Sequence, residues 1–166
     1  MRDYRKKYSD LIESLRSQVI EHYGDSLVSL VFFGSVARGL FRPDSDIDLL
    51  IIAENLPRGR VPRVRDFEQG VEARFEEVFR SLRREGIHPV LSPIIKTPDE
   101  VSLGSPLFLD MVEDARISYD RGQFFKKYLE DLSAKLRRMG ARKVKFKGGY
   151  YWLLKPDYRP GDIIEL

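Results

Sequence analysis

Residues 26–53 contain two apolar runs with a polar loop between them, and this pattern constrains the fold more than any other feature of the chain. The runs SLVSLVFFG (26–34) and DIDLLIIA (46–53) are short and rich in branched and aromatic side chains, which is typical of buried strands. Asp46 and Asp48 stand at the start of the second run. A charge at the mouth of a buried strand is costly unless it is paired, solvated or bound to metal, so the loop requires a chemical explanation.

The two aspartates form a candidate metal site. Residues two apart in a strand project from the same face, so the carboxylates of Asp46 and Asp48 are expected to point together. Adjacent carboxylates repel each other unless a divalent cation lies between them, and oxygen ligands of this type suit Mg²⁺ or Mn²⁺. We therefore expect Asp46 and Asp48 to hold one of these ions.

The Gly-Ser pair at the end of the first run is a candidate phosphate site. Gly34 allows a close approach of the backbone, and Ser35 offers a hydroxyl and an N–H group at the start of a predicted short helix, where anions are favoured. Arg38 lies one turn further and can reach the same anion. A phosphate cradle that faces a metal-binding aspartate pair indicates a site for a metal–nucleotide complex.

The full pattern is a Gly-Ser pair, ten residues and then Asp-x-Asp, within the segments GSVARG and SDIDLL. It resembles the nucleotidyltransferase superfamily of DNA polymerase β type, in particular the small minimal nucleotidyltransferases of archaea and bacteria. The match covers about residues 26–53. The order of the predicted helices and strands agrees with the same superfamily over residues 5–97.

The resemblance implies roles for the site residues. Asp46 and Asp48 would be the catalytic residues and the ligands of Mg²⁺ or Mn²⁺. Gly34 and Ser35 would hold the β- and γ-phosphates of an NTP, with ATP favoured, and Arg38 would neutralise charge on the triphosphate. A nucleotidyl group would pass to a protein, an RNA or a small molecule, and pyrophosphate would leave. Minimal members often pair with a small helical protein, as toxin and antitoxin, so the resemblance also implies such a partner.

The chain departs from the superfamily pattern on the strand after the long second helix, where a third carboxylate usually faces the aspartate pair. That strand reads HPVLSPIIK (88–96), and its more polar parity places Ser92 in the third position, with His88 as the second choice. Neither is a carboxylate, so either another acid reaches the site or catalysis is impaired. The acids considered for this role are Glu54, Glu100, Asp110 and Glu113. The alternative function is a nucleotide- or RNA-binding regulatory module that lacks the third carboxylate.

The rest of the chain predicts an α/β (α+β) fold, a small mixed sheet flanked by helices. Periodicity predicts helices over 5–23, 64–85, 105–115 and 121–139, strands over 26–34, 46–53 and 88–96, and extended segments at 117–120, 143–146 and 150–155. Pro89 and Pro93 predict that the third strand is bulged or at a sheet edge. We expect one domain over 1–166, with a nucleotidyltransferase core at 5–97 and a helical and irregular C-terminal extension at 98–166.

The net charge of +3 conceals a basic segment at 121–147, whose ten basic and two acidic side chains give a balance of +8. This segment is either an RNA-binding surface or a solvated helix face followed by a turn. The neighbouring aromatic residues Tyr150, Tyr151 and Trp152 either stack on bases or pack the C-terminal tail onto the core.

Composition excludes several other classes of protein. The chain has no cysteine, which rules out disulfides and thiol catalysis. No apolar run approaches the ~20 residues of a membrane span, and the N-terminal residues lack the apolar segment of a secretory signal, so we expect a cytoplasmic protein without membrane contact. Charged residues make up 33% of the chain, and amides are few, which indicates a thermophilic source.

Overall fold

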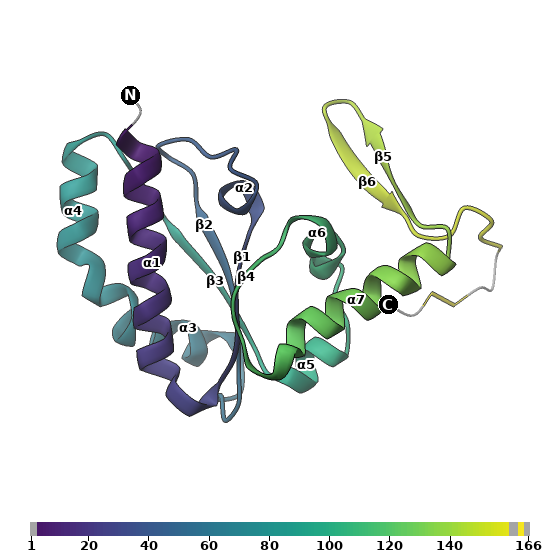
Figure 1. Ribbon diagram of the computed structural model, residues 1–166, viewed down its shortest axis with the longest axis horizontal. Helices are drawn as coiled ribbons and strands as arrows, with labels where there is room; N and C mark the ends of the chain where they lie inside the picture. Colours follow the sequence, from purple (N-terminus) through teal and green to yellow (C-terminus); the bar gives the residue numbers. More distant parts are fainter. Residues whose placement is uncertain (1–2, 160–162, 165–166) are drawn as a thin grey trace.

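The computed structural model describes residues 3–159 and 163–164, and a four-stranded sheet lies at its centre (Figure 1). The strands are β1 (Leu27–Phe33), β2 (Ile47–Ala53), β3 (Leu91–Lys96) and β4 (Arg116–Asp120). They lie in the order β3-β2-β1-β4, with β2 antiparallel to β1 and parallel to β3, and β4 antiparallel to β1. The predicted mixed sheet is confirmed, and β3 is an edge strand, as its two prolines predicted.

Helices cover both faces of the sheet (Figure 1). One face carries α1 (Asp3–Tyr23), α3 (Arg60–Gly70) and α4 (Glu76–Arg84), and the other carries α5 (Pro98–Ser102), α6 (Leu107–Asp114) and α7 (Phe124–Arg138). Alternate residues of β2 enter the two cores: Leu49 packs on the α1 side and Leu50 on the α7 side. Because Asp48 shares the parity of Leu50, its side chain projects on the face that α5, α6 and α7 cover.

The first helix confirms the amphipathic pattern of its sequence. Leu11, Leu15 and Val19 are buried against the sheet, whereas Lys6 and Asp10 pair with each other on the exposed side. Spacings of four residues put the apolar side chains on one stripe. Within the described part of the chain, no helix has the length and apolar content needed to cross a bilayer.

The second helix begins earlier than the prediction of 64–85. α3 starts at Arg60, four residues before the predicted start and shortly after Pro57 and Gly59. Pro62 falls in the first turn of α3, where backbone N–H groups have no partner within the helix, so a proline is tolerated there. The proline therefore lies inside the helix and does not delay its start.

The same predicted helix is also interrupted in the middle. α3 ends at Gly70, and a 3₁₀ turn over Glu72–Phe75 separates it from α4. A Cβ at position 70 would overlap the ring of His22 on α1, so the two helices approach each other closely at the break. The turn changes the phase of the apolar stripe, and Val78 on α4 is 43% exposed.

The sheet extends beyond residue 97, where the sequence placed the end of the core. β4 pairs with β1, with Leu30 opposite Tyr119, so part of the predicted extension at 98–166 belongs to the central sheet. The short helix α5, which was not predicted, follows β3 directly. It begins with a capping box between Thr97 and Glu100.

Asp120 is the last residue of β4 and precedes the last long helix by several residues. α7 begins at Phe124, after a 3₁₀ turn over Arg121–Gln123. The carboxylate of Asp120 nevertheless accepts hydrogen bonds from the backbone N–H groups of Phe125 and Lys126, each at 3.0 Å. It thus satisfies donors of the first helical turn from a position before the 3₁₀ turn.

A separate hairpin follows α7. It consists of β5 (Arg142–Phe146) and β6 (Gly149–Leu153), which pair antiparallel at the yellow end of the chain in Figure 1. Trp152 packs against the core on the α7 side of the sheet, while Phe146 and Tyr151 are exposed. The C-terminal extension therefore contains strands as well as helices.

Candidate active site

The Gly-Ser turn lies directly against the second aspartate. β1 ends at Phe33, which pairs with Asp48 of β2, and the short helix α2 (Gly34–Ala37) begins at the next residue. Gly34 has a φ of 69°, and a Cβ at this position would overlap Oδ2 of Asp48. Only glycine permits this backbone conformation and this approach together without strain. The structure therefore brings Gly34 and Ser35 to the carboxylate from which the sequence separates them by more than a dozen residues.

Asp48 lies between Asp46 and the edge strand. In the parallel pairing of β2 and β3, Asp48 is opposite Ser92. Burial raises the pKa of Asp48, and the charge of Asp46 raises it further, while a hydrogen bond from Ser92 and the charge of Arg38 act in the opposite direction. The structure thus brings together four residues that were expected to share the site.

The loop that leads to Asp46 is held by residues that the sequence did not single out. The hydroxyl of Tyr8 on α1 donates to the carbonyl of Ser45 at 2.8 Å, and its ring packs on Phe41 with centroids 4.9 Å apart. Burial of Tyr8 raises the pKa of its hydroxyl to about 12, so it remains a donor. The signal for Tyr8 was its place on the apolar stripe of α1, which gave no hint of the loop that it contacts.

Arg38 lies at the end of α2 beside a small cavity. Its guanidinium is 3.3 Å from the carboxylate of Asp114 on α6, a pairing that was not predicted. The cavity has a volume of about 230 Å³ and is lined by Phe33, Gly34, Arg38, Leu107, Asp110, Met111 and Asp114. Gly34 and Arg38 therefore face α6 across this cavity.

The hairpin is fastened to α6 through Asp110. The hydroxyl of Tyr150 and the indole N–H of Trp152 donate to the two oxygens of this carboxylate, each at 2.9 Å. Lys143 approaches the same carboxylate at 3.3 Å and Glu113 at 2.6 Å. Tyr150 and Trp152 thus pack the C-terminal strands onto the domain, as one of the two interpretations predicted, and base stacking stays a prediction for the exposed Tyr151.

None of the acids considered for the third position joins the aspartate pair. Glu54 pairs with Arg121 and Glu100 with Arg63, while Asp110 and Glu113 contact the hairpin. Within residues 3–159 and 163–164, no group of three or more His, Cys, Asp or Glu side chains is placed to hold a metal. The local donors are therefore Asp46, Asp48 and Ser92.

His88, the second choice for the third position, lies before β3 with an exposed side chain. Its backbone N–H donates to the carbonyl of Pro43 at 2.7 Å, which links it to the loop before Asp46. This contact uses the main chain alone. Among the described residues, the structure shows no contact between the imidazole ring and either aspartate.

The donor set fits one Mg²⁺ or Mn²⁺. Mg²⁺ in nucleotide enzymes commonly uses one or two carboxylates and completes its shell with water and substrate phosphates. Burial raises the pKa of Asp48, and repulsion by the charge of Asp46 raises it further. A divalent cation between the two carboxylates would relieve this repulsion. Asp46 and Asp48 would hold the ion, and Gly34, which contacts Asp48, also lines the cavity of about 230 Å³.

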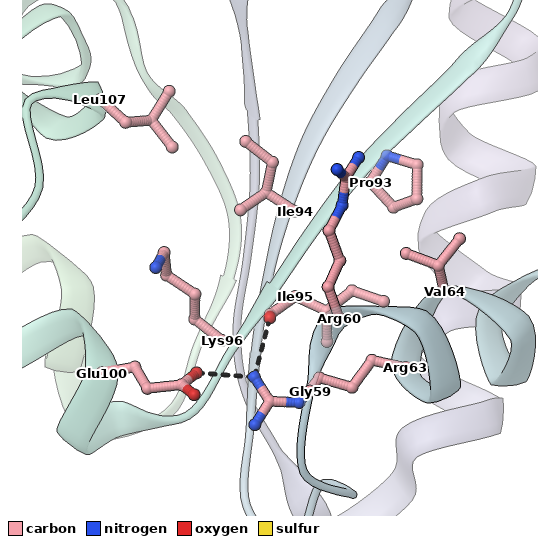
Figure 2. A pocket seen from close by; sticks show the side chains of 10 residues that line it. All are labelled: Gly59, Arg60, Arg63, Val64, Pro93, Ile94, Ile95, Lys96, Glu100 and Leu107. Carbon is pink, nitrogen blue, oxygen red and sulfur yellow. Dashed lines mark hydrogen bonds and ion pairs between the residues drawn. The ribbon is translucent and has the colours of Figure 1, made fainter.

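A larger cavity lies at the edge strand β3 (Figure 2). It has a volume of about 560 Å³ and is lined by Gly59, Arg60, Arg63, Val64, Pro93, Ile94, Ile95, Lys96, Glu100 and Leu107. Arg63 is only 8% exposed and donates to the carbonyl of Ile95 at 3.2 Å and to Glu100 at 2.7 Å. The cavity thus lies where α3, β3, α5 and α6 meet.

The basic segment 121–147 is divided between α7 and the hairpin. Arg121 pairs with Glu54, and Lys143 pairs with Glu113, so two of its cations are neutralised within the protein. Lys145 and Lys147 are exposed at the end of the hairpin, next to the exposed ring of Phe146. RNA binding by this segment stays a prediction.

Comparison with known proteins places these features in a family. A family model described as a nucleotidyltransferase domain matches residues 12–135. A curated relative from Methanocaldococcus jannaschii, named "putative protein adenylyltransferase", is 34% identical over 139 residues, which cover 81% of this chain and 86% of the relative.

Solved structures give more distant matches. A "putative nucleotidyltransferase" from Sulfolobus solfataricus is 20% identical, with a TM-score of 0.42, over 72% of this chain and 89% of that one. A toxin–antitoxin structure with AMP-PNP is 14% identical, with a TM-score of 0.42, over 76% of this chain and 93% of that one. The family model and the curated relative carry the assignment: the chain belongs to the nucleotidyltransferase domain family and is an enzyme of that class.

Proposed function

We propose that the protein transfers AMP from ATP to a hydroxyl group of a protein acceptor, with Mg²⁺ or Mn²⁺ held by Asp46 and Asp48. The observation that carries the proposal is the contact of the Gly34–Ser35 turn with Asp48, which joins an anion cradle to a carboxylate pair. The name of the Methanocaldococcus jannaschii relative supports AMP as the transferred group and a protein as the acceptor.

The reaction balances as a single displacement. The acceptor hydroxyl oxygen attacks the α-phosphorus of ATP, the bond from that phosphorus to the oxygen bridging the α- and β-phosphates breaks, and pyrophosphate leaves. The hydroxyl proton passes to solvent. A bound Mg²⁺ supplies charge stabilisation to the phosphates in such a reaction.

The residues of the chain have separate roles in this step. Gly34 and Ser35 bind the β- and γ-phosphates through backbone N–H groups and the serine hydroxyl. Arg38 neutralises charge on the triphosphate and exchanges its contact with Asp114 for the ligand. Ser92 orients the Asp48 carboxylate by its hydrogen bond and stands where a third carboxylate was expected.

The test uses ATP, GTP, CTP and UTP labelled at the α-phosphate, with Mg²⁺ or Mn²⁺ and an extract of the source cells. We expect label from ATP on a protein with the wild type and none with the Asp46→Asn/Asp48→Asn variant. Label on RNA or on a small molecule would assign a different acceptor, and preference for another NTP would correct the donor.

A second function, a nucleotide-binding regulatory module, is favoured by one observation. Ser92 stands opposite Asp48, and no third acid approaches in the described part of the chain. Metal-dependent ATP binding by calorimetry without transfer to any acceptor would support this function. The absence of both ATP binding and transfer would contradict both proposals.

A further inference from the structure

The order of the strands decides from which side an acceptor approaches. In an in-line displacement, the attacking and leaving oxygens lie on opposite sides of the phosphorus. The Gly34–Ser35 turn follows β1, the aspartates belong to the start of β2, and Ser92 belongs to β3. Because β2 lies between β1 and β3, pyrophosphate held beside β1 leaves the β3 side for the acceptor.

The β3 side has the cavity of about 560 Å³. Residues Pro93–Lys96, which line it, follow Ser92 directly along the edge strand. Its walls are apolar at Val64, Ile94 and Leu107. This volume is in the range of ordinary ligand sites, and the cavity runs along the strand away from the carboxylates.

The charges that line the cavity fall into two groups (Figure 2). Arg63 and Glu100 form an ion pair at 2.7 Å, and Arg63 also donates to the carbonyl of Pro57 at 2.7 Å, so these two residues are committed to the fold. For Arg60 and Lys96, the described part of the chain shows no hydrogen bond or ion pair. The pKa of Glu100 is lowered mainly by the hydrogen bond from Arg63, and the charge of Lys96 makes a smaller contribution. Figure 2 shows the guanidinium of Arg60 beside Pro93 and the ammonium of Lys96 on the α5 side of β3.

We propose that this cavity binds an extended segment of the acceptor protein that carries acidic residues near its reactive hydroxyl. The inference rests on the proposed function, and it names the acceptor class for that site. Arg60 lies close to the catalytic end of β3, and Lys96 lies four residues beyond Ser92, or ~13 Å along a strand. An acidic side chain next to the acceptor hydroxyl would match Arg60, and one about four residues away would match Lys96.

The acceptor segment is recognised through side chains and not as an added strand. Pro93 has no N–H group to offer at the sheet edge, and the carbonyl of Ile95 already accepts from Arg63. A regular ladder of backbone hydrogen bonds with a further strand is therefore blocked at two successive outward positions of β3. Charge and the apolar walls are what the cavity offers to a ligand.

The experiment compares two sets of synthetic peptides in the labelled-ATP assay. Each peptide has a central Ser, Thr or Tyr, flanked on both sides by glutamates in one set and by lysines in the other. We expect the wild type to label the glutamate set at least tenfold faster. The Arg60→Glu/Lys96→Glu variant should lose this preference, while its affinity for ATP stays within twofold of the wild type.

Two control variants carry the same change in charge. Arg83→Glu/Arg84→Glu alters exposed cations on α4, and Lys145→Glu/Lys147→Glu alters the end of the hairpin. Both should keep the preference for the glutamate peptides. Loss of the preference with the hairpin variant and not with the cavity variant would overturn the inference, because the acidic segment would then lie on the hairpin.

The remaining outcomes separate this inference from the proposed function. Equal labelling of the two peptide sets by the wild type would overturn the inference and leave protein adenylylation intact. If the wild type labels no peptide, fluorescence anisotropy of a glutamate peptide decides the binding question, and a tenfold weaker affinity in the cavity variant supports the inference without transfer. Unchanged affinity overturns it. If Arg60→Glu/Lys96→Glu does not fold, Arg60→Gln alone replaces it, since this side chain is exposed.

Discussion

At the scale of single residues, two contacts shape the candidate site. The backbone at Gly34 lies against the carboxylate of Asp48, and the hydroxyl of Tyr8 holds the carbonyl of Ser45. The first was predictable, because the Gly-Ser and Asp-x-Asp motifs lie in one short segment. The second was not, because Tyr8 and Ser45 are 37 residues apart and nothing local in the sequence connects them.

Gly34→Ala should abolish most of the activity. The added methyl group would displace Asp48, and a displacement of about 1 Å at a catalytic group costs ~100-fold in rate. Gly39→Ala is the matched control, since Gly39 has the same φ of 69° but open space around its Cβ position. Transfer rates and urea unfolding of both variants would check this prediction. We expect both variants to lose about 1 kcal/mol of stability and only Gly34→Ala to show a large loss of rate. Equal rates would contradict the role of the close approach.

Tyr8→Phe should lower the free energy of unfolding by about 1 kcal/mol and weaken binding of Mg²⁺ and ATP, because the loop before Asp46 loses its hydrogen bond. Tyr23→Phe serves for comparison. Its hydroxyl is buried with no hydrogen-bond partner in the described structure, so its removal should be neutral or slightly stabilising. Thermal melting and calorimetry measure both effects, and normal ATP affinity in Tyr8→Phe would show that the loop does not depend on this contact.

At the scale of helices and strands, local periodicity predicted the elements that bury one apolar face or that are buried on both faces. These include α1, β1, β2, β3 and α7. The break between α3 and α4 was missed, and at this break Gly70 lies against His22 of another helix, a contact that the local sequence does not show. The place of β4 in the sheet was missed for a similar reason, since pairing with β1 joins residues about 90 positions apart. Strand pairing and helix contacts of this kind are set by tertiary structure.

The hairpin provides a test at this scale, because its Trp152 is the sole tryptophan of the chain. Burial alone would raise the pKa of Asp110, but hydrogen bonds from Trp152, Tyr150 and Lys143 outweigh it and lower the pKa. A lowered pKa in the folded state means that the ionised form of Asp110 stabilises docking of the hairpin at neutral pH. This stabilisation is lost as the pH falls through the folded pKa, which lies below the usual ~4 of an aspartate.

Asp110→Ala should therefore release the hairpin at neutral pH and shift the fluorescence of Trp152 to longer wavelengths. Acidification of the wild type should produce the same shift. Asp131→Ala, at an exposed position of α7, should change neither the spectrum nor its pH dependence. An unchanged spectrum in Asp110→Ala would show that the hairpin is held by other contacts.

At the scale of the whole molecule, the Asp48 carboxylate lowers stability in the absence of ligand. The raised pKa of Asp48, caused by burial and then by Asp46, means that its ionised form is disfavoured in the folded protein. Stability gained from this group therefore appears as the pH falls and is absent at neutral pH. The role proposed for Asp48 and the stability of the ligand-free protein therefore oppose each other.

Asp48→Asn should raise the free energy of unfolding of the ligand-free protein by about 1 kcal/mol. The same variant should lose the increase in melting temperature that Mg²⁺ with ATP gives to the wild type, since a ligand stabilises only the form that it binds. Asp44→Asn, an exposed change in the same loop, should leave both quantities near the wild-type values. Equal stabilisation of Asp48→Asn by Mg²⁺ with ATP would contradict the assignment of Asp48 as a metal ligand.

The contiguity of the β1–β2 unit has a consequence for how this protein can diversify. Gly34, Asp46 and Asp48 lie on two successive antiparallel strands and the loop between them, whereas the cavity beside β3 is assembled from α3, β3, α5 and α6. Mutations that reshape the cavity therefore fall outside the segment that carries the carboxylates. Related proteins can therefore change their target by substitutions around the cavity, while the segment with Gly34, Asp46 and Asp48 stays the same.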